Sequence, residues 1–106
     1  MSSRWRRFEV MLPRQFNDGR EVPGEWVSQA ILEISDHFGA VSYETQIIEG
    51  HWRESGILYR DDLARIIVDV PDSKAHRTWM KVFKSRWKEQ LEQLEIWMVS
   101  YRIEIE

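Results

Sequence analysis

The chain contains no cysteine, and this absence removes several kinds of chemistry at once. Without thiols there are no disulfides, no thiolate zinc sites and no cysteine nucleophiles, which is typical of a protein from a reducing compartment. The longest apolar runs are only a few residues, so the sequence predicts no membrane span and no secretory signal peptide. We therefore expect a cytoplasmic protein that does not enter a membrane.

A strong charge of one sign is also missing, because the net charge is only −3 over 106 residues. This balance makes general binding to nucleic acid unlikely. The sequence lacks a phosphate-cradling glycine-rich loop, an H-E-x-x-H zinc motif and a G-x-S-x-G nucleophile motif, so no cofactor is predicted. What the chain does have is six tryptophans, more aromatic surface than one small core requires.

Residue periodicity predicts one domain, residues 1–106, in which strands and helices alternate. Residues 5–12 alternate with period two and end at Pro13, whereas residues 25–38 carry apolar residues at helical spacing and end at Gly39. Two further strands, residues 40–52 and 57–70, flank a predicted four-residue hairpin loop at 53–56. Asp72 or Ser73 is expected to cap a second helix, and residues 97–105 alternate again.

The element order β-α-β-β-α-β predicts an α+β sandwich with a ferredoxin-like fold. In that fold a four-stranded antiparallel sheet has the order 4-1-3-2, and two helices cover one face. The segments "FNDGREVP", "FGAVSYETQ" and "EGHW" resemble those of small bacterial proteins of unknown function. The resemblance extends over nearly the whole chain and implies no particular activity.

The register of the central hairpin follows from the requirement that apolar side chains share one face. With a loop at 53–56, Glu44 is expected opposite Arg65, Thr45 opposite Ala64, and Glu49 opposite Arg60. Alternation also places Met98 and Arg102 on the outer face of the sheet, away from the helices.

A ligand-binding cleft is predicted where the 13–23 loop meets the hairpin. The candidate residues are Phe16, Asn17, Asp18, Arg20, Glu49, His51 and Arg60. His51 and Glu49 share a face, but two ligands without a defined third make a poor metal site, so no metal is predicted. A charged hairpin tip with a purely structural role is the favoured interpretation, and a catalytic role is the alternative.

The outer face of the predicted sheet is the second candidate site, because nothing in a two-helix domain covers it. Its interface candidates are Ile48, Trp52, Ile57, Tyr59, Leu63 and Ile67. We expect a homodimer through this face, in an interaction or small-ligand-binding module with a protein or small-molecule partner. The alternative is a small cofactor-free enzyme of the dimeric α/β-barrel type, in which His51, Glu49 or Tyr59 transfers a proton in a pocket at the hairpin end.

Overall fold

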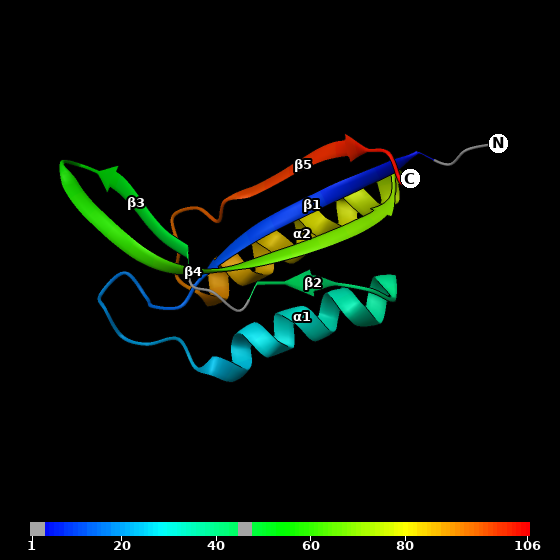
Figure 1. Ribbon diagram of the computed structural model, residues 1–106. Coiled ribbons are helices and arrows are strands. Elements are labelled where there is room, and N and C mark those ends of the chain that lie inside the picture. The colour runs from blue at the N-terminus through cyan, green and yellow to red at the C-terminus, as the bar shows by residue number, and fades with distance from the viewer. Residues whose placement is uncertain (1–3, 45–47) are drawn as a thin grey trace.

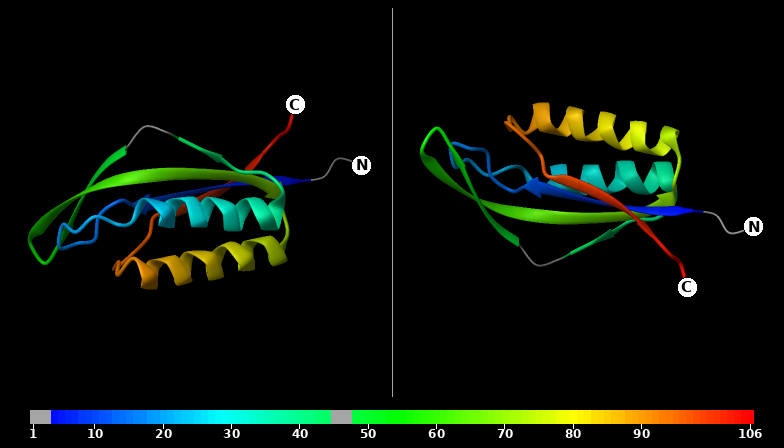
Figure 2. Two further views of the ribbon diagram at one scale, coloured as in Figure 1. Left: turned by 90° about the horizontal axis from the view of Figure 1, so that it is seen from below. Right: turned by 90° about the horizontal axis from the view of Figure 1, so that it is seen from above.

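The computed structural model describes residues 4–44 and 48–106, arranged as one antiparallel sheet with two helices (Figure 1). The elements are β1 (Trp5–Pro13), α1 (Gly24–Phe38), β2 (Ser42–Tyr43), β3 (Ile48–Glu54), β4 (Ile57–Pro71), α2 (Lys74–Gln90) and β5 (Met98–Ile103). Both helices lie on one side of the sheet, as the two views of Figure 2 show. Within residues 4–44 and 48–106, the other side of the sheet carries no helix.

The predicted ferredoxin-like sheet of four strands, and with it the α+β sandwich, is wrong. The sheet has five strands in the order β2-β4-β1-β5, and β3 is a separate strand that pairs with β4 off this path. The 15-residue β4 is too long to stay under the helices, since a strand rises about 3.3 Å per residue. Its first half bends away with β3 as a projecting arm, so the sheet is curled and the molecule is 50 Å long (Figure 1).

Capping residues define the ends of the two helices. α1 ends at Gly39, which has a φ of 85° and donates its N–H to the Ser35 carbonyl at 2.7 Å. Glycine adopts this left-handed conformation without a steric penalty. α2 begins after Ser73, whose side chain accepts a hydrogen bond from the His76 N–H at 3.1 Å. Both predicted caps are therefore confirmed.

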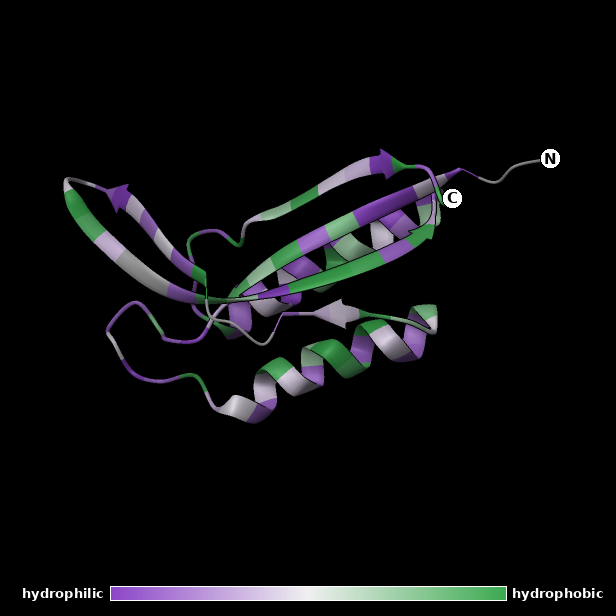
Figure 3. Ribbon diagram, in the orientation of Figure 1, coloured by the Kyte–Doolittle hydropathy of each residue, from purple (hydrophilic) through white to green (hydrophobic). Residues whose placement is uncertain are grey.

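The core lies between the helices and the inner face of the sheet. Even-numbered residues of β1 and β4 point into it, so hydrophobic and hydrophilic bands alternate along these strands (Figure 3). The buried core residues include Phe8, Val10, Leu12, Ile66, Val68 and Val70 from the sheet, and Ala30, Ile34, Met80, Phe83 and Trp87 from the helices.

The register prediction is confirmed near the core and wrong in the arm. Ser42 pairs with Ile67, and the Glu44 N–H donates to the Arg65 carbonyl at 3.1 Å. In the arm, however, Glu49 lies opposite Asp62, and Arg60 lies opposite His51. The register shifts by two residues between β2 and β3, because the arm closes in a two-residue turn at Ser55 and Gly56. The predicted pair of Thr45 and Ala64 falls outside the described residues.

The face assigned to the last strand is also wrong. Val99 pairs with Glu9 and Tyr101 pairs with Arg7, so the odd-numbered residues of β5 point to the outer face. Met98 instead packs against the core cluster. The alternating pattern is the same for either face, and only the pairing with β1 decides between them.

Candidate functional site

The arm formed by β3 and β4 builds one wall of the candidate site. Its turn residues Ser55 and Gly56 have φ values of 52° and 79°, and positive φ at both central positions is typical of a type I′ turn. Behind the turn, Trp52 and Tyr59 stack face to face, with ring centroids 4.3 Å apart and planes 12° apart. This cross-strand aromatic pair stabilises the arm on its outer face.

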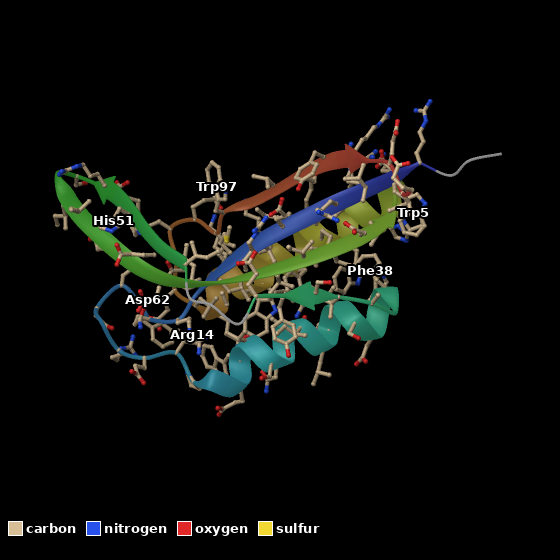
Figure 4. All side chains as sticks on the ribbon, in the orientation of Figure 1. Trp5, Arg14, Phe38, His51, Asp62 and Trp97 are labelled. Atoms are coloured by element: carbon tan, nitrogen blue, oxygen red, sulfur yellow. The ribbon has the colours of Figure 1, made fainter. Side chains whose placement is uncertain are left out.

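A concave pocket of about 430 Å³ lies on the outer face, between the arm and the segment that leads into β5. We call it the hairpin pocket. It is mostly apolar, and its lining residues are Met11, Pro13, Gly50, His51, Trp52, Glu54, Leu63, Gln93, Leu94, Glu95 and Trp97. Figure 4 labels His51 on the arm and Trp97 just before β5. Ligand pockets are typically concave and apolar, with a few polar groups that fix orientation.

His51 lines this pocket and is paired with Glu49, which lies outside the pocket lining. The His51 Nε2 lies 2.9 Å from a Glu49 carboxylate oxygen, and both side chains are about half exposed. The predicted shared face of these residues is thus confirmed. A carboxylate hydrogen-bonded to an imidazole holds the ring in one orientation. The pair is able to bind a polar ligand group or to accept a proton.

A chain of hydrogen-bonded charged groups crosses the outer face beside the pocket. Glu9, although on the face without helices, is only 7% exposed. Its carboxylate accepts a hydrogen bond from Arg65 Nε at 2.7 Å and another from the Tyr101 hydroxyl, and Arg65 also contacts Glu44 at 2.6 Å. We call Glu9, Arg65, Glu44 and Tyr101 the outer-face network.

Hydrogen bonds within this network shift the pKa values of its members. The Tyr101 hydroxyl first, and then Arg65, hold the pKa of Glu9 below its ordinary value, whereas the same hydrogen bond raises the pKa of Tyr101. Glu9 therefore stays ionised, and the proton stays on Tyr101 at neutral pH. Alternation along β1 does not predict the burial of Glu9 or its hydrogen bond with Tyr101.

The residues of the predicted ligand-binding cleft lie in two separate places, the β1–α1 loop and the arm. Arg20 lies 4.5 Å from the centre of the Phe16 ring and pairs with Asp18 at 2.6 Å, all within the β1–α1 loop. A second concavity of about 440 Å³ separates this loop from the arm, and its lining includes Phe16 and Asn17. Glu49 and His51 belong to the arm, and the side chain of Arg60 lies outside the described residues. The assignment of ligand-binding roles to these residues stays a prediction.

The interface candidates lie together on the outer face, as their alternation predicts. Ile57 is exposed at the arm tip, Leu63 lies in the hairpin pocket, and Ile48 and Ile67 are half-buried. Two strongly exposed apolar residues of the same surface, Leu94 (60%) and Trp97 (67%), were not predicted as interface residues from the sequence. The high number of tryptophans indicated that some would be exposed. Trp97 was not among the residues expected there, because the last strand was predicted to turn its odd-numbered residues toward the core.

Two features are absent from the described part of the chain. No group of three or more His, Asp or Glu side chains there is placed to hold a metal ion. No described helix is long and apolar enough to cross a membrane.

No protein-family model and no curated protein sequence matches the chain. Among solved structures, one match is a phage SAM lyase in complex with S-methyl-5'-thioadenosine. The chain shares that protein's fold. The TM-score is 0.71, and the match covers 99% of this chain and 93% of the lyase chain at 15% sequence identity. The TM-score establishes a common fold, and an identity of 15% does not carry an activity from one protein to the other.

Proposed function

We propose that the chain is a small-ligand-binding module and that its ligand occupies the hairpin pocket. The observation that carries this proposal is the concave, aromatic pocket on the open face of the sheet. The fold shared with a ligand-bound lyase supports it. The absence of cysteine further supports a role in the cytoplasm.

The chemistry of the lining favours a planar aromatic ligand with polar substituents. The indoles of Trp52 and Trp97 offer flat surfaces for stacking, and Leu63 and Met11 provide an apolar floor. His51, Gln93 and Glu54 supply hydrogen-bonding groups at the rim. A nucleoside thioether such as S-methyl-5'-thioadenosine, which the phage lyase holds, combines a planar base, hydroxyl groups and an apolar methylthio group.

Calorimetry with S-methyl-5'-thioadenosine tests this proposal, together with quenching of tryptophan fluorescence. We expect saturable binding that Trp97→Ala weakens at least tenfold, because Trp97 is exposed and its loss removes a stacking surface without disturbing the core. Leu32→Ala is the matched control, since Leu32 is an equally exposed apolar residue on α1. Equal binding by wild type and Trp97→Ala, or no binding by wild type, would contradict the proposed site.

An enzyme is the second candidate, because His51, which lines the hairpin pocket, is hydrogen-bonded to Glu49. In this scheme the imidazole accepts a proton from the carbon next to the one that carries the sulfonium of S-adenosylmethionine. The electron pair of that C–H bond forms a C=C double bond, the C–S bond breaks and S-methyl-5'-thioadenosine leaves, while Glu49 stabilises the imidazolium. The test is incubation with S-adenosylmethionine and chromatography for S-methyl-5'-thioadenosine. We expect His51→Gln to lower the rate at least a hundredfold while leaving ligand affinity within threefold. Product formation by His51→Gln at the wild-type rate would remove this pair from the mechanism.

The proposed assembly is a homodimer through the outer face. The exposed residues Trp97 and Leu94 line the hairpin pocket, which is open to solvent in one copy of the chain, and Ile57 is exposed at the tip of the arm. Apposition of two such faces buries this surface and closes the pocket. A closed pocket also strengthens electrostatic contacts with a ligand, because it excludes water.

A further inference from the structure

Three arginines converge on one carboxylate at the end of the molecule opposite the arm. Asp72 lies between β4 and α2, where the start of β1 and the end of β5 also meet (Figure 1). Its carboxylate receives Arg6 of β1 at 3.0 Å, Arg77 of α2 at 2.5 Å and Arg102 of β5 at 3.3 Å. The Asp72 side chain is only 4% exposed. The arginines therefore surround it almost completely.

The charge of this cluster is not balanced by its own members. One carboxylate against three guanidinium groups leaves two positive charges, and a single arginine would suffice to satisfy Asp72. Arg6 is largely buried at 18% exposure and uses another nitrogen for the Ser100 hydroxyl at 3.0 Å. Arg6 therefore has a structural role, and the excess charge belongs to the other two arginines.

Arg77 and Arg102 are the accessible members, with 41% and 60% of their side chains exposed. Each directs one nitrogen to Asp72, whereas a guanidinium group carries five N–H donors. Asp72 stays ionised because the Arg6 hydrogen bond lowers its pKa, so it continues to hold both guanidinium groups in place. Donors held in place before a ligand arrives reduce the conformational cost of binding.

Arg102 lines a cavity of about 690 Å³, whereas Arg77 lies outside its lining and adjoins it only through the shared contact with Asp72. Arg4 and Trp5 line it on one side, and residues 103–106 line it on the other. Trp5 offers a flat apolar surface, and Arg4 adds a further positive charge. Glu104 and Glu106 also line the cavity, and their carboxylates disfavour a ligand with many negative charges.

We propose that Arg77 and Arg102 form a binding site for the phosphate group of a small phosphorylated metabolite, whose organic part lies in the adjacent cavity. Guanidinium groups donate paired hydrogen bonds to phosphate oxygens in the geometry that this group prefers. The cavity accommodates a ligand of the size of a nucleoside monophosphate. This site is separate from the hairpin pocket and does not depend on the function proposed there.

The experiment is calorimetry of the full chain with AMP, inorganic phosphate and adenosine at constant ionic strength. We expect AMP to bind at least tenfold more tightly than adenosine, because adenosine lacks the phosphate. Inorganic phosphate should bind measurably and compete with AMP. Arg102→Gln should weaken AMP binding at least tenfold, and Arg77→Gln serves as a second variant.

Arg86→Gln is the matched control. Arg86 lies on α2, is 54% exposed and pairs with one carboxylate, that of Glu33, at 2.9 Å. Its replacement removes the same charge as Arg77→Gln does, from the same helix α2, and should change AMP affinity less than twofold. Equal losses from Arg86→Gln and Arg102→Gln, or equal affinity for AMP and adenosine, would overturn the proposal. Circular dichroism checks that each variant is folded before binding is measured.

Discussion

Glu9 shows how one residue departs from the pattern of its strand. Outward-pointing residues of a sheet are usually exposed, yet Glu9 is buried beneath Arg65 and Tyr101, which donate hydrogen bonds to it. A buried carboxylate with two donors is stable as an ion, and loss of its charge leaves Arg65 with a weaker partner. The outer-face network therefore holds the side chains at the centre of this face in one arrangement.

Replacement of Glu9 by Gln should lower the free energy of unfolding by about 1 to 3 kcal/mol at pH 7. The pKa of Glu9 in the folded protein lies below its ordinary value of 4.5, so its stabilising contribution is complete above that pH. The contribution is lost as the pH falls through the lower folded-state value. Urea unfolding from pH 3 to pH 7 should therefore show the difference between wild type and Glu9→Gln narrowing in acid. Glu89→Gln, an exposed change on α2, should show no such trend.

At the scale of the element, the arm depends on its two-residue turn. Gly56 has a φ of 79°, and a Cβ added there would meet no atom within 4 Å. The cost of Gly56→Ala is therefore a backbone cost, about 1 kcal/mol. Ser55→Asn should instead stabilise the arm by about 0.5 kcal/mol, because Asn-Gly is the preferred pair in a type I′ turn. Thermal unfolding should shift in opposite directions for the two variants, and a shared direction would contradict this turn type.

Helix α2 offers a direct comparison of its two faces. Phe83 is fully buried against the sheet, and the neighbouring Val82 is 54% exposed. Phe83→Ala should cost about 3 to 5 kcal/mol through lost burial and a new cavity. Val82→Ala should change stability by less than about 0.5 kcal/mol. Urea unfolding of both variants measures these values, and similar losses would show that the helix face is assigned incorrectly.

At the scale of the whole molecule, the outer face of the sheet exposes apolar side chains to solvent in a single copy of the chain. The proposed homodimer would bury them. Burial of a few hundred Å² of apolar surface there would contribute about 5 to 10 kcal/mol per subunit. Association costs offset part of this, with estimates of about 4 to 15 kcal/mol. The proposed dimer is thus possible on energetic grounds if the faces fit closely.

Leu63→Arg should dissociate the dimer without unfolding the subunit, because Leu63 lies in the hairpin pocket outside the inner core. Light scattering at micromolar concentration should give the dimer mass for wild type and the monomer mass for Leu63→Arg. Leu32→Arg is the control, since Leu32 is exposed on α1 and belongs to the helix layer. A monomeric wild type, or a dimeric Leu63→Arg protein, would contradict assembly through this face.

Sequence periodicity determined the helices, their caps and the inner faces of β1 and β4, because these depend on local conformation and on burial of one apolar face. It also determined the pairing of Ser42 to Glu44 beside the core. It could not determine the register of the arm, because a shift of two residues leaves every side chain on the same face. Periodicity also could not determine which residues of β5 face the core, because its odd-numbered and even-numbered residues both include apolar side chains.

Only the tertiary structure decided which residues meet at the candidate sites. The bend of β4 brings His51 and Trp52 to the same pocket as Trp97, across a distance in sequence over which no local pattern extends. The pairing of β5 with β1 places Tyr101 on Glu9, and the meeting of three strands with α2 gathers three arginines on Asp72. These contacts join residues from distant segments. They are fixed by long-range pairing and packing, which a single sequence does not specify.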